Sequence, residues 1–140
     1  MNNITDPKTE TSTVGVAVVT TYLPGHSKPE LDQYAFAYTI TISNESDVPV
    51  QLLSRHWVIT DADNSVQEVR GEGVVGEQPL IPPGKSFRYT SGASLATPVG
   101  CMEGSYTMVR RDSDEQASSA DGHFEVPIPA FSLHTPTALH

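Results

Sequence analysis

The sequence predicts an all-β fold, a sandwich of about seven antiparallel strands. Large apolar residues alternate with small or polar ones along several segments, which is typical of half-buried strands. Turn-forming residues separate these segments at short intervals, and no segment has the pattern of an amphipathic helix. These observations favour a sandwich over a parallel α/β sheet. The 140 residues suffice for one domain with a genuine core.

The first expected strand covers residues 14–22, where Val14, Val16 and Val18 share one parity. The clearest strand follows at residues 34–42, because five tyrosine, phenylalanine and isoleucine side chains share one face there while alanines and threonines take the other. The remaining strands are expected at residues 50–60, 65–69, 87–91, 104–110 and 122–128. Turn chemistry separates them at Asn44–Pro49, Asp61–Asn64 and Pro82–Gly84.

We expect three parts along the chain: a flexible polar arm at 1–13, the sandwich domain at 14–135, and a tail at 136–140. The polar stretch 111–121 is suited only to a solvated hairpin loop.

The expected strand at residues 50–60 carries both apolar core residues and charged or polar ones. Along residues 50–60, Leu53, Trp57 and Ile59 share the core face, and His56 points away from it. Arg55 shares the parity of Trp57, which predicts a bulge, a sheet end or a buried ion pair. We interpret Trp57 as part of the core.

Charge and composition exclude several partner classes. The formal net charge of −9 opposes binding to nucleic acid or to anionic membranes, because such binding depends on neutralising phosphates. We expect no signal peptide, and no apolar run approaches the roughly 20 residues of a membrane span. The single cysteine, Cys101, cannot form an internal disulfide, so we expect a cytoplasmic protein.

The segment Gly71–Gly76 reads GEGVVG and matches the glycine pattern of dinucleotide-binding proteins. That pattern requires a strand-to-helix turn, whereas here three prolines follow within positions 79–83 and exclude a helix. We therefore expect a glycine-bearing loop or irregular strand with positive φ or close backbone approach. An anion-binding concavity remains as an alternative, and its candidate residues are Arg70, Gly71, Gly73 and Gly76.

Metal-binding and catalytic patterns are weaker. Asp61, Asp63 and neighbouring residues fall on a calcium-loop template, but Val66 replaces the glycine that its sharp turn requires. The five histidines lack zinc-motif spacing, and no nucleophile–base set is recognisable. We expect no metal site, no cofactor and no enzymatic activity.

Several motifs in one order closely resemble the bacterial ApaG family. They read RHW-x-IT-D, RGEGVVGEQP-x-IPPG-x-F-x-Y-x-SG, L-x-TP-x-G-x-MEG-x-Y-x-M and F-x-VPIPAFSL, and together cover about residues 14–135. The resemblance implies an immunoglobulin-like or fibronectin type III-like sandwich. It also implies an unsettled function, since the family name is associated with diadenosine polyphosphate metabolism and with cobalt and magnesium tolerance. Related eukaryotic domains suggest protein binding.

Two functions follow as hypotheses. The first is a non-enzymatic module that binds an unidentified protein partner through loops or sheet edges. The alternative is a protein that binds phosphate, pyrophosphate or a nucleotide through the glycine loop, with a possible link to cobalt or magnesium tolerance. A direct divalent-cation role has slight support from the Asp61/Asp63 turn. The sequence alone determines neither the oligomeric state nor whether Arg55, Arg70 and Arg88 converge in space.

Overall fold

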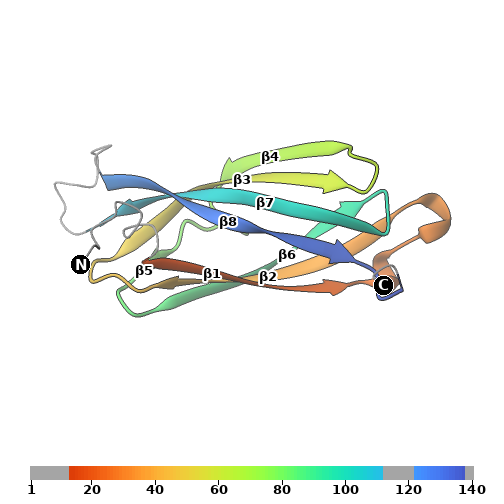
Figure 1. Ribbon diagram of the computed structural model, residues 1–140. Coiled ribbons are helices and arrows are strands. Elements are labelled where there is room, and N and C mark those ends of the chain that lie inside the picture. Colours follow the sequence, from red (N-terminus) through yellow and green to blue (C-terminus); the bar gives the residue numbers. More distant parts are fainter. Residues whose placement is uncertain (1–12, 112–121, 138–140) are drawn as a thin grey trace, which may run out of the picture.

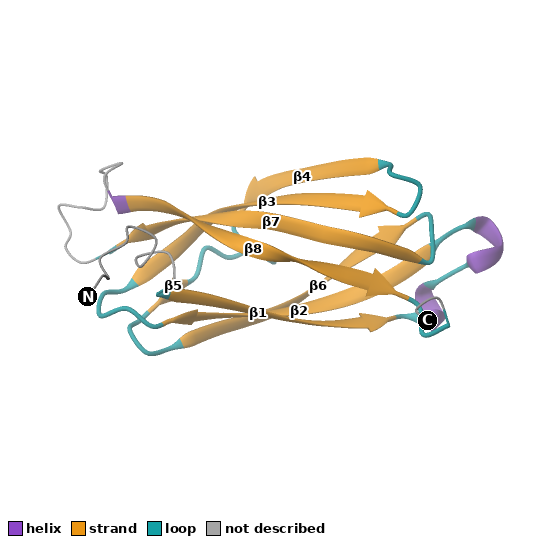
Figure 2. Ribbon diagram, in the orientation of Figure 1, coloured by secondary structure: helices purple, strands orange, loops and turns teal. Residues whose placement is uncertain are grey.

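The computed structural model describes residues 13–111 and 122–137, which form two packed antiparallel sheets (Figure 1). The strands are β1 (Val14–Tyr22), β2 (Tyr34–Asn44), β3 (Val50–Asp61), β4 (Val66–Glu72), β5 (Leu80–Ile81), β6 (Ser86–Leu95), β7 (Val99–Arg110) and β8 (His123–His134). Two short 3₁₀ turns, η1 (Pro24–His26) and η2 (Pro29–Leu31), join β1 to β2 (Figure 2). The predicted all-β sandwich is confirmed.

The smaller sheet has the order β1-β2-β6, and the larger one has the order β4-β3-β7-β8 with β5 paired to β3. Every expected strand is present, and β5 is the addition. β6, β7 and β8 extend further than the sequence predicts. The predicted arm at 1–13 and the hairpin loop at 111–121 lie outside the described residues, apart from Thr13 and Arg111.

Aromatic side chains dominate the core between the sheets. Trp57 is 2% exposed, which confirms its predicted core position. Its ring lies edge-on to Tyr38, with the centroids 5.4 Å apart, and to Phe131 on β8, with the centroids 5.8 Å apart. Gly104 lies opposite Trp57 in the β3–β7 ladder, and a Cβ at Gly104 would fall 2.0 Å from the carbonyl oxygen of His56. The two strands can therefore approach closely only at a glycine.

A β-bulge interrupts β3 between Leu52 and Ser54. Before the bulge Leu52 is fully buried, and after it Trp57 and Ile59 face the core. The expectation that Leu53 shares the core face is wrong, because the extra residue shifts the alternation. The bulge is also one of the features that the parity of Arg55 predicts.

The two lateral sides of the sandwich differ. On one side the edge strands β1 and β8 lie against each other (Figure 1), and we call this the closed side. No comparable contact joins the other two edge strands, β4 and β6. We call the side that these two strands form the open side.

The chain between β4 and β6 fills one end of the open side. Val74 and Ile81 in this segment are each only 1% exposed. Asn44, also 1% exposed, fixes the segment to the β2–β3 turn: its Nδ2 donates to the carbonyls of Val48 (2.8 Å) and Ile81 (2.9 Å). Its Oδ1 accepts from the backbone N–H of Ser46 (2.9 Å) and from the Ser46 hydroxyl (2.6 Å). Both the nitrogen and the oxygen of the Asn44 side-chain amide are therefore hydrogen-bonded.

Candidate functional site

The glycine segment forms the end of β4 and a tight hairpin. Gly71 belongs to β4, while Val74 and Glu77 exchange two backbone hydrogen bonds of 2.8 and 2.9 Å. Between them Val75 and Gly76 have φ values of 43° and 82°. Positive φ at both central residues is characteristic of a type I′ turn. The expected glycine loop with positive φ is confirmed, and it contains no helix N-terminus.

Gly73 is required where the hairpin meets β4. Its φ is 63°, and a Cβ there would lie 2.2 Å from the carbonyl oxygen of Glu77. Its N–H donates to the Leu53 carbonyl at 2.8 Å, and the N–H groups of Val74 and Glu77 are used within the turn. Three of the loop amides are therefore committed to backbone acceptors.

Gly71 makes room for Arg55. The two residues are partners in the β3–β4 ladder, and a Cβ at Gly71 would lie 2.8 Å from the Arg55 guanidinium carbon. The guanidinium passes across Gly71, and its Nη1 donates to the carbonyls of Gly73 (2.8 Å) and Glu72 (3.1 Å). Glycine is needed here because of the neighbouring side chain and not because of φ.

Arg55 also approaches the tyrosines of the core. Burial raises the pKa values of Tyr38, Tyr89 and Tyr106, and the positive charge of Arg55 lowers all three by a smaller amount. The hydroxyls of Tyr89 and Tyr106 are 2.5 Å apart and join the two sheets. The arginine thus lies at the border between a tyrosine cluster and the edge of β4.

In the part of the chain that the structure describes, β4 pairs with β3 and with no strand on its outer edge. The backbone N–H of Asp61 donates to the Ser65 carbonyl, and that of Gly73 donates to the Leu53 carbonyl. Between these two pairs of the β3–β4 ladder, hydrogen-bonded pairs recur at every second residue. By this alternation the backbone groups of 67, 69 and 71 face β3, and those of Val66, Glu68, Arg70 and Glu72 face outward. Arg55 therefore reaches the edge, because it donates to the outward-facing carbonyl of Glu72.

A polar hollow of about 410 Å³ lies on the outer face of the larger sheet. It is lined by Ser54, Arg55, His56, Arg70, Gly71, Glu72, Ser105, Thr107 and Glu125. Glu68 lies 3.4 Å from His56 Nε2 and 3.6 Å from Arg70, and Glu125 accepts a 2.6 Å hydrogen bond from Thr107. Two of the four predicted anion-site residues, Arg70 and Gly71, line this hollow. Gly73 and Gly76 belong to the hairpin instead.

A second hollow, of about 600 Å³, lies at the end of the sandwich where β1 ends and β2 begins. Its lining is mostly apolar and consists of Tyr22, Pro24, Pro29, Tyr34, Pro98, Thr135, Pro136 and Thr137. It contains none of the residues that the sequence singled out as candidates for binding.

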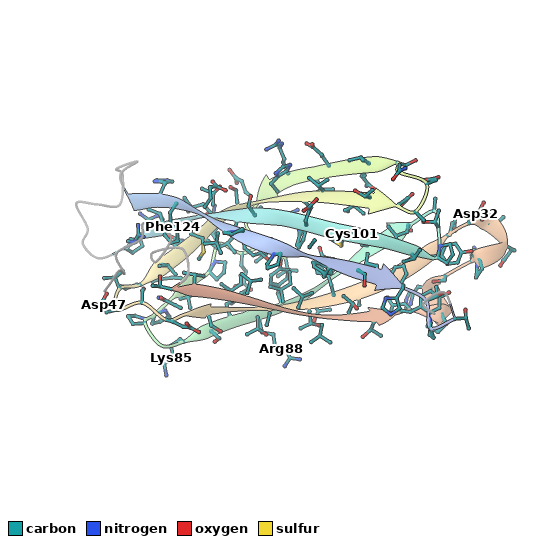
Figure 3. All side chains as sticks on the ribbon, viewed as in Figure 1. Asp32, Asp47, Lys85, Arg88, Cys101 and Phe124 are labelled. Atoms are coloured by element: carbon teal, nitrogen blue, oxygen red, sulfur yellow. The ribbon has the colours of Figure 1, made fainter. Side chains whose placement is uncertain are left out.

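The three arginines do not converge. Arg55 faces the inside of the sandwich, and Arg70 follows the parity of His56 on the outer face of the larger sheet. Arg88 projects from β6, away from the larger sheet (Figure 3). Within residues 13–111 and 122–137 no group of three or more His, Cys, Asp or Glu side chains could hold a metal ion. None of the helical turns described in these ranges has the length and apolar character to cross a bilayer.

The position of Arg55 at the β4 edge is what sequence reasoning missed. An arginine at core parity was visible, and so was a glycine sixteen positions later. The pairing of Arg55 with Gly71 depends on the register of β3 and β4, which the turn at Asp61–Asn64 sets. No pattern within either strand specifies that register.

The fold and the described site define a small two-sheet β-sandwich domain with an unpaired edge strand and a buried tyrosine cluster. A model of the ApaG domain matches residues 24–110, and the chain belongs to the ApaG family. The resemblance inferred from the sequence motifs is thereby confirmed.

Close relatives share most of their length with this chain. Protein ApaG of Ralstonia nicotianae is 60% identical over 126 residues, which are 89% of this chain and 94% of that protein. Protein ApaG of Pseudomonas aeruginosa is 56% identical over 127 residues, which are 91% of this chain and 94% of the relative. These names state no activity.

Solved structures agree with the fold. A crystal structure of a Bordetella pertussis protein named ApaA has a TM-score of 0.79 and 48% identity, and it covers 89% of this chain and 94% of its own. The C-terminal domain of wzt has a TM-score of 0.51 at 9% identity over 91% of this chain and 75% of that one, a likeness of fold alone.

Proposed function

We propose that this protein is a non-enzymatic protein-interaction module that binds an extended segment of a partner along an unpaired strand edge on the open side. The observation that carries the proposal is the arrangement of edge strands: β4 and β6 each end a sheet, and among the strands of residues 13–111 and 122–137 each of them pairs on one side alone. An unpaired edge offers a row of N–H and C=O groups to an incoming strand.

The four edges are not equally suited to this role. β8 carries Pro127 and Pro129, which have no backbone N–H, and it lies against β1. The edge of β8 therefore offers fewer hydrogen-bond donors and is covered by β1. β4 and β6 contain no proline. Their outward-facing N–H groups are therefore available to a partner strand.

A lack of catalytic geometry in the described residues supports the non-enzymatic part. A serine–histidine contact, Ser132 Oγ to His134 Nδ1 at 3.4 Å, is exposed on β8, and no described carboxylate forms an ion pair with that ring. His56 Nε2 lies 3.4 Å from Glu68, and no hydrogen bond of the described residues joins His56 to a serine, threonine or cysteine side chain. Nucleophilic catalysis requires a base that is itself oriented by a third group.

A displayed library of random 12-residue peptides tests the proposal. Selected peptides are titrated into isotope-labelled protein, and we expect saturable amide shifts along β4 or β6. The variant Glu68→Pro removes one outward-facing N–H of β4 without removing a ladder hydrogen bond, and Glu68→Gln is its matched control. Binding at β4 should weaken at least about tenfold in the proline variant alone, since an unmade hydrogen bond leaves a desolvated group. Selected peptides that shift neither edge would contradict the proposal.

Anion binding is the second candidate. It is supported by Arg70, whose side chain is 70% exposed, and by Gly71, both of which line the polar hollow. It is opposed by Glu72 and Glu125 in the same lining and by the commitment of the loop amides. An NMR titration with pyrophosphate and ATP, with and without Mg²⁺, decides it. Saturable shifts centred on Arg70 and Gly71 would favour this function, and no shift at millimolar ligand would exclude it.

A further inference from the structure

We infer that the β4 edge recognises an acidic side chain, so that the partner segment carries an Asp or Glu whose carboxylate meets Arg55. This inference rests on the proposed function and specifies the chemistry of its partner. Three features of the open side carry it: the reach of Arg55 to the edge, the lack of an acidic partner for Arg55 among the described residues, and the missing side chain at Gly71.

Arg55 starts on β3, yet its guanidinium is available at the edge. Gly71 is the β4 residue beside it, and the guanidinium occupies the space that a side chain there would fill. Nη1 donates to the Glu72 carbonyl, which faces outward by the ladder alternation. A cation from the second strand is therefore presented at the edge of the first.

The charge of Arg55 is incompletely matched. Among the described residues no carboxylate lies within ion-pair distance of Arg55, and its bonds to protein groups are the two made by Nη1 to carbonyls. A guanidinium has five N–H donors arranged to fit a carboxylate in a bidentate manner. Because Arg55 is half-buried, an added carboxylate would interact with it in a medium of lower dielectric constant than water.

Strand geometry fixes where the acid must lie. An added strand would run roughly 4.8 Å beyond β4, with alternate side chains directed to the inner face. Its inner positions lie beside Gly71 and Val69, since these two β4 residues face inward. The carboxylate belongs beside Gly71, where nothing separates it from the guanidinium. Val69 packs against the core, so the neighbouring inner position favours an apolar residue.

The preferred segment is therefore acidic–x–apolar, read in the direction that follows β4 from Gly71 towards Val69. The acidic residues of β4 do not oppose this. Glu68 and Glu72 follow the parity of Arg70 on the outer face, and Glu68 is already within 4 Å of His56 and Arg70 (3.4 and 3.6 Å). The inner face of this edge carries Arg55 as its charged group among the described residues.

The experiment repeats the selection from the random 12-residue library with four proteins: the parent, Arg55→Gln, Gly71→Ala and Arg70→Gln. Gly71→Ala keeps the charge but displaces the guanidinium, since the new methyl group would lie 2.8 Å from it. This variant keeps the test decisive if Arg55→Gln fails to fold. Arg70→Gln is the matched control, because it removes a positive charge from the outer face of the same edge.

The parent and Arg70→Gln should enrich the acidic–x–apolar pattern, and the other two variants should lose the acid. For one selected peptide, changing the acid to its amide should weaken binding to the parent about tenfold, and binding to Arg55→Gln less than about threefold. Peptides that shift β4 or β6 amides without any acidic preference would overturn this inference and leave the proposed function standing. Peptides that shift neither edge would overturn both.

Discussion

The two lateral sides of this sandwich differ in the residues that lie between the edges of the two sheets. On the closed side most inner residues of β1 and β8 are apolar: Val16 and Val18 on β1 and Phe131 on β8 pack against the core. On the open side the inner positions include Arg55, Gly71 and the half-buried Ser91. One side is sealed by side chains, and the other keeps polar groups next to unpaired backbone.

Under the proposed function, this difference assigns stability to one side of the domain and partner recognition to the other. The closed side carries prolines on its edge and buries apolar surface, which stabilises the fold and discourages strand addition. The inner face of the open side includes polar residues where the closed side buries apolar surface. We expect substitutions on the two sides to differ accordingly in their effects on the free energy of unfolding.

The largest contrast is expected between Leu133→Ala on β8 and Val69→Ala on β4. Leu133 is 0% exposed, so its truncation should cost about 2–5 kcal/mol of unfolding free energy. Val69 is half-buried, and its truncation should cost about 1 kcal/mol. Urea unfolding at 25 °C measures both. Equal losses would show that the open side is packed as well as the closed side.

The outer edge of β4 can be distinguished from its inner edge by proline. The N–H of Gln67 faces β3 and that of Glu68 faces outward, by the alternation of the ladder. Gln67→Pro should therefore cost about 3 kcal/mol, and Glu68→Pro less than about 1 kcal/mol. Thermal unfolding of both variants tests this. A reversed order would mean that the pairing of β4 differs from the one described.

The tyrosines that join the two sheets predict alkaline sensitivity. Burial raises the pKa values of Tyr89 and Tyr106, so the folded state holds protons that the unfolded chain releases above about pH 10. The free energy of unfolding should be unaffected by these groups below that pH and should fall above it, by roughly 1.4 kcal/mol per pH unit for each tyrosine. Urea unfolding between pH 8 and 11 measures the slope. The double variant Tyr89→Phe/Tyr106→Phe should reduce it, and an unchanged slope would assign the sensitivity to other groups.

The smallest effect is expected at the hairpin of the open side. Val75 is β-branched, is 53% exposed and has a φ of 43°, a conformation that asparagine adopts more readily. Val75→Asn should raise the free energy of unfolding by about 0.5–1 kcal/mol. Val19→Asn is the control, because Val19 is 66% exposed in the regular strand β1, where asparagine is disfavoured. A gain in both variants would mean that removal of exposed valine, and not relief of φ, is responsible.

The alternation of Tyr34 to Ile42 was enough to predict β2, because a half-buried strand must place its apolar residues at every second position. The end of β8 was predicted too early. The expected strand ended at residue 128, whereas β8 continues through Pro129 to His134, because an edge strand tolerates proline where the missing N–H would face away from the sheet.

For the glycine segment, the sequence predicted the backbone conformation but not the role of Gly71. The prolines after Gly76 excluded a helix, and positive φ followed from the glycines themselves. That Gly71 serves Arg55 could not be derived, because the need arises from a side chain on another strand. Local patterns report backbone conformation, whereas the site depends on register between strands.

The burial of Asn44 also bears on how the chain could be produced. Asn44, Glu45 and Ser46 form an acceptor triplet for N-linked sugar. In the folded protein the Asn44 amide nitrogen is 2.8 and 2.9 Å from its two carbonyl acceptors and is closed to an enzyme. Folding and glycosylation at this residue are therefore mutually exclusive. A chain directed through a glycosylating secretory pathway would either fold first and escape the sugar, or receive it and lose the contacts that join the β2–β3 turn to β5.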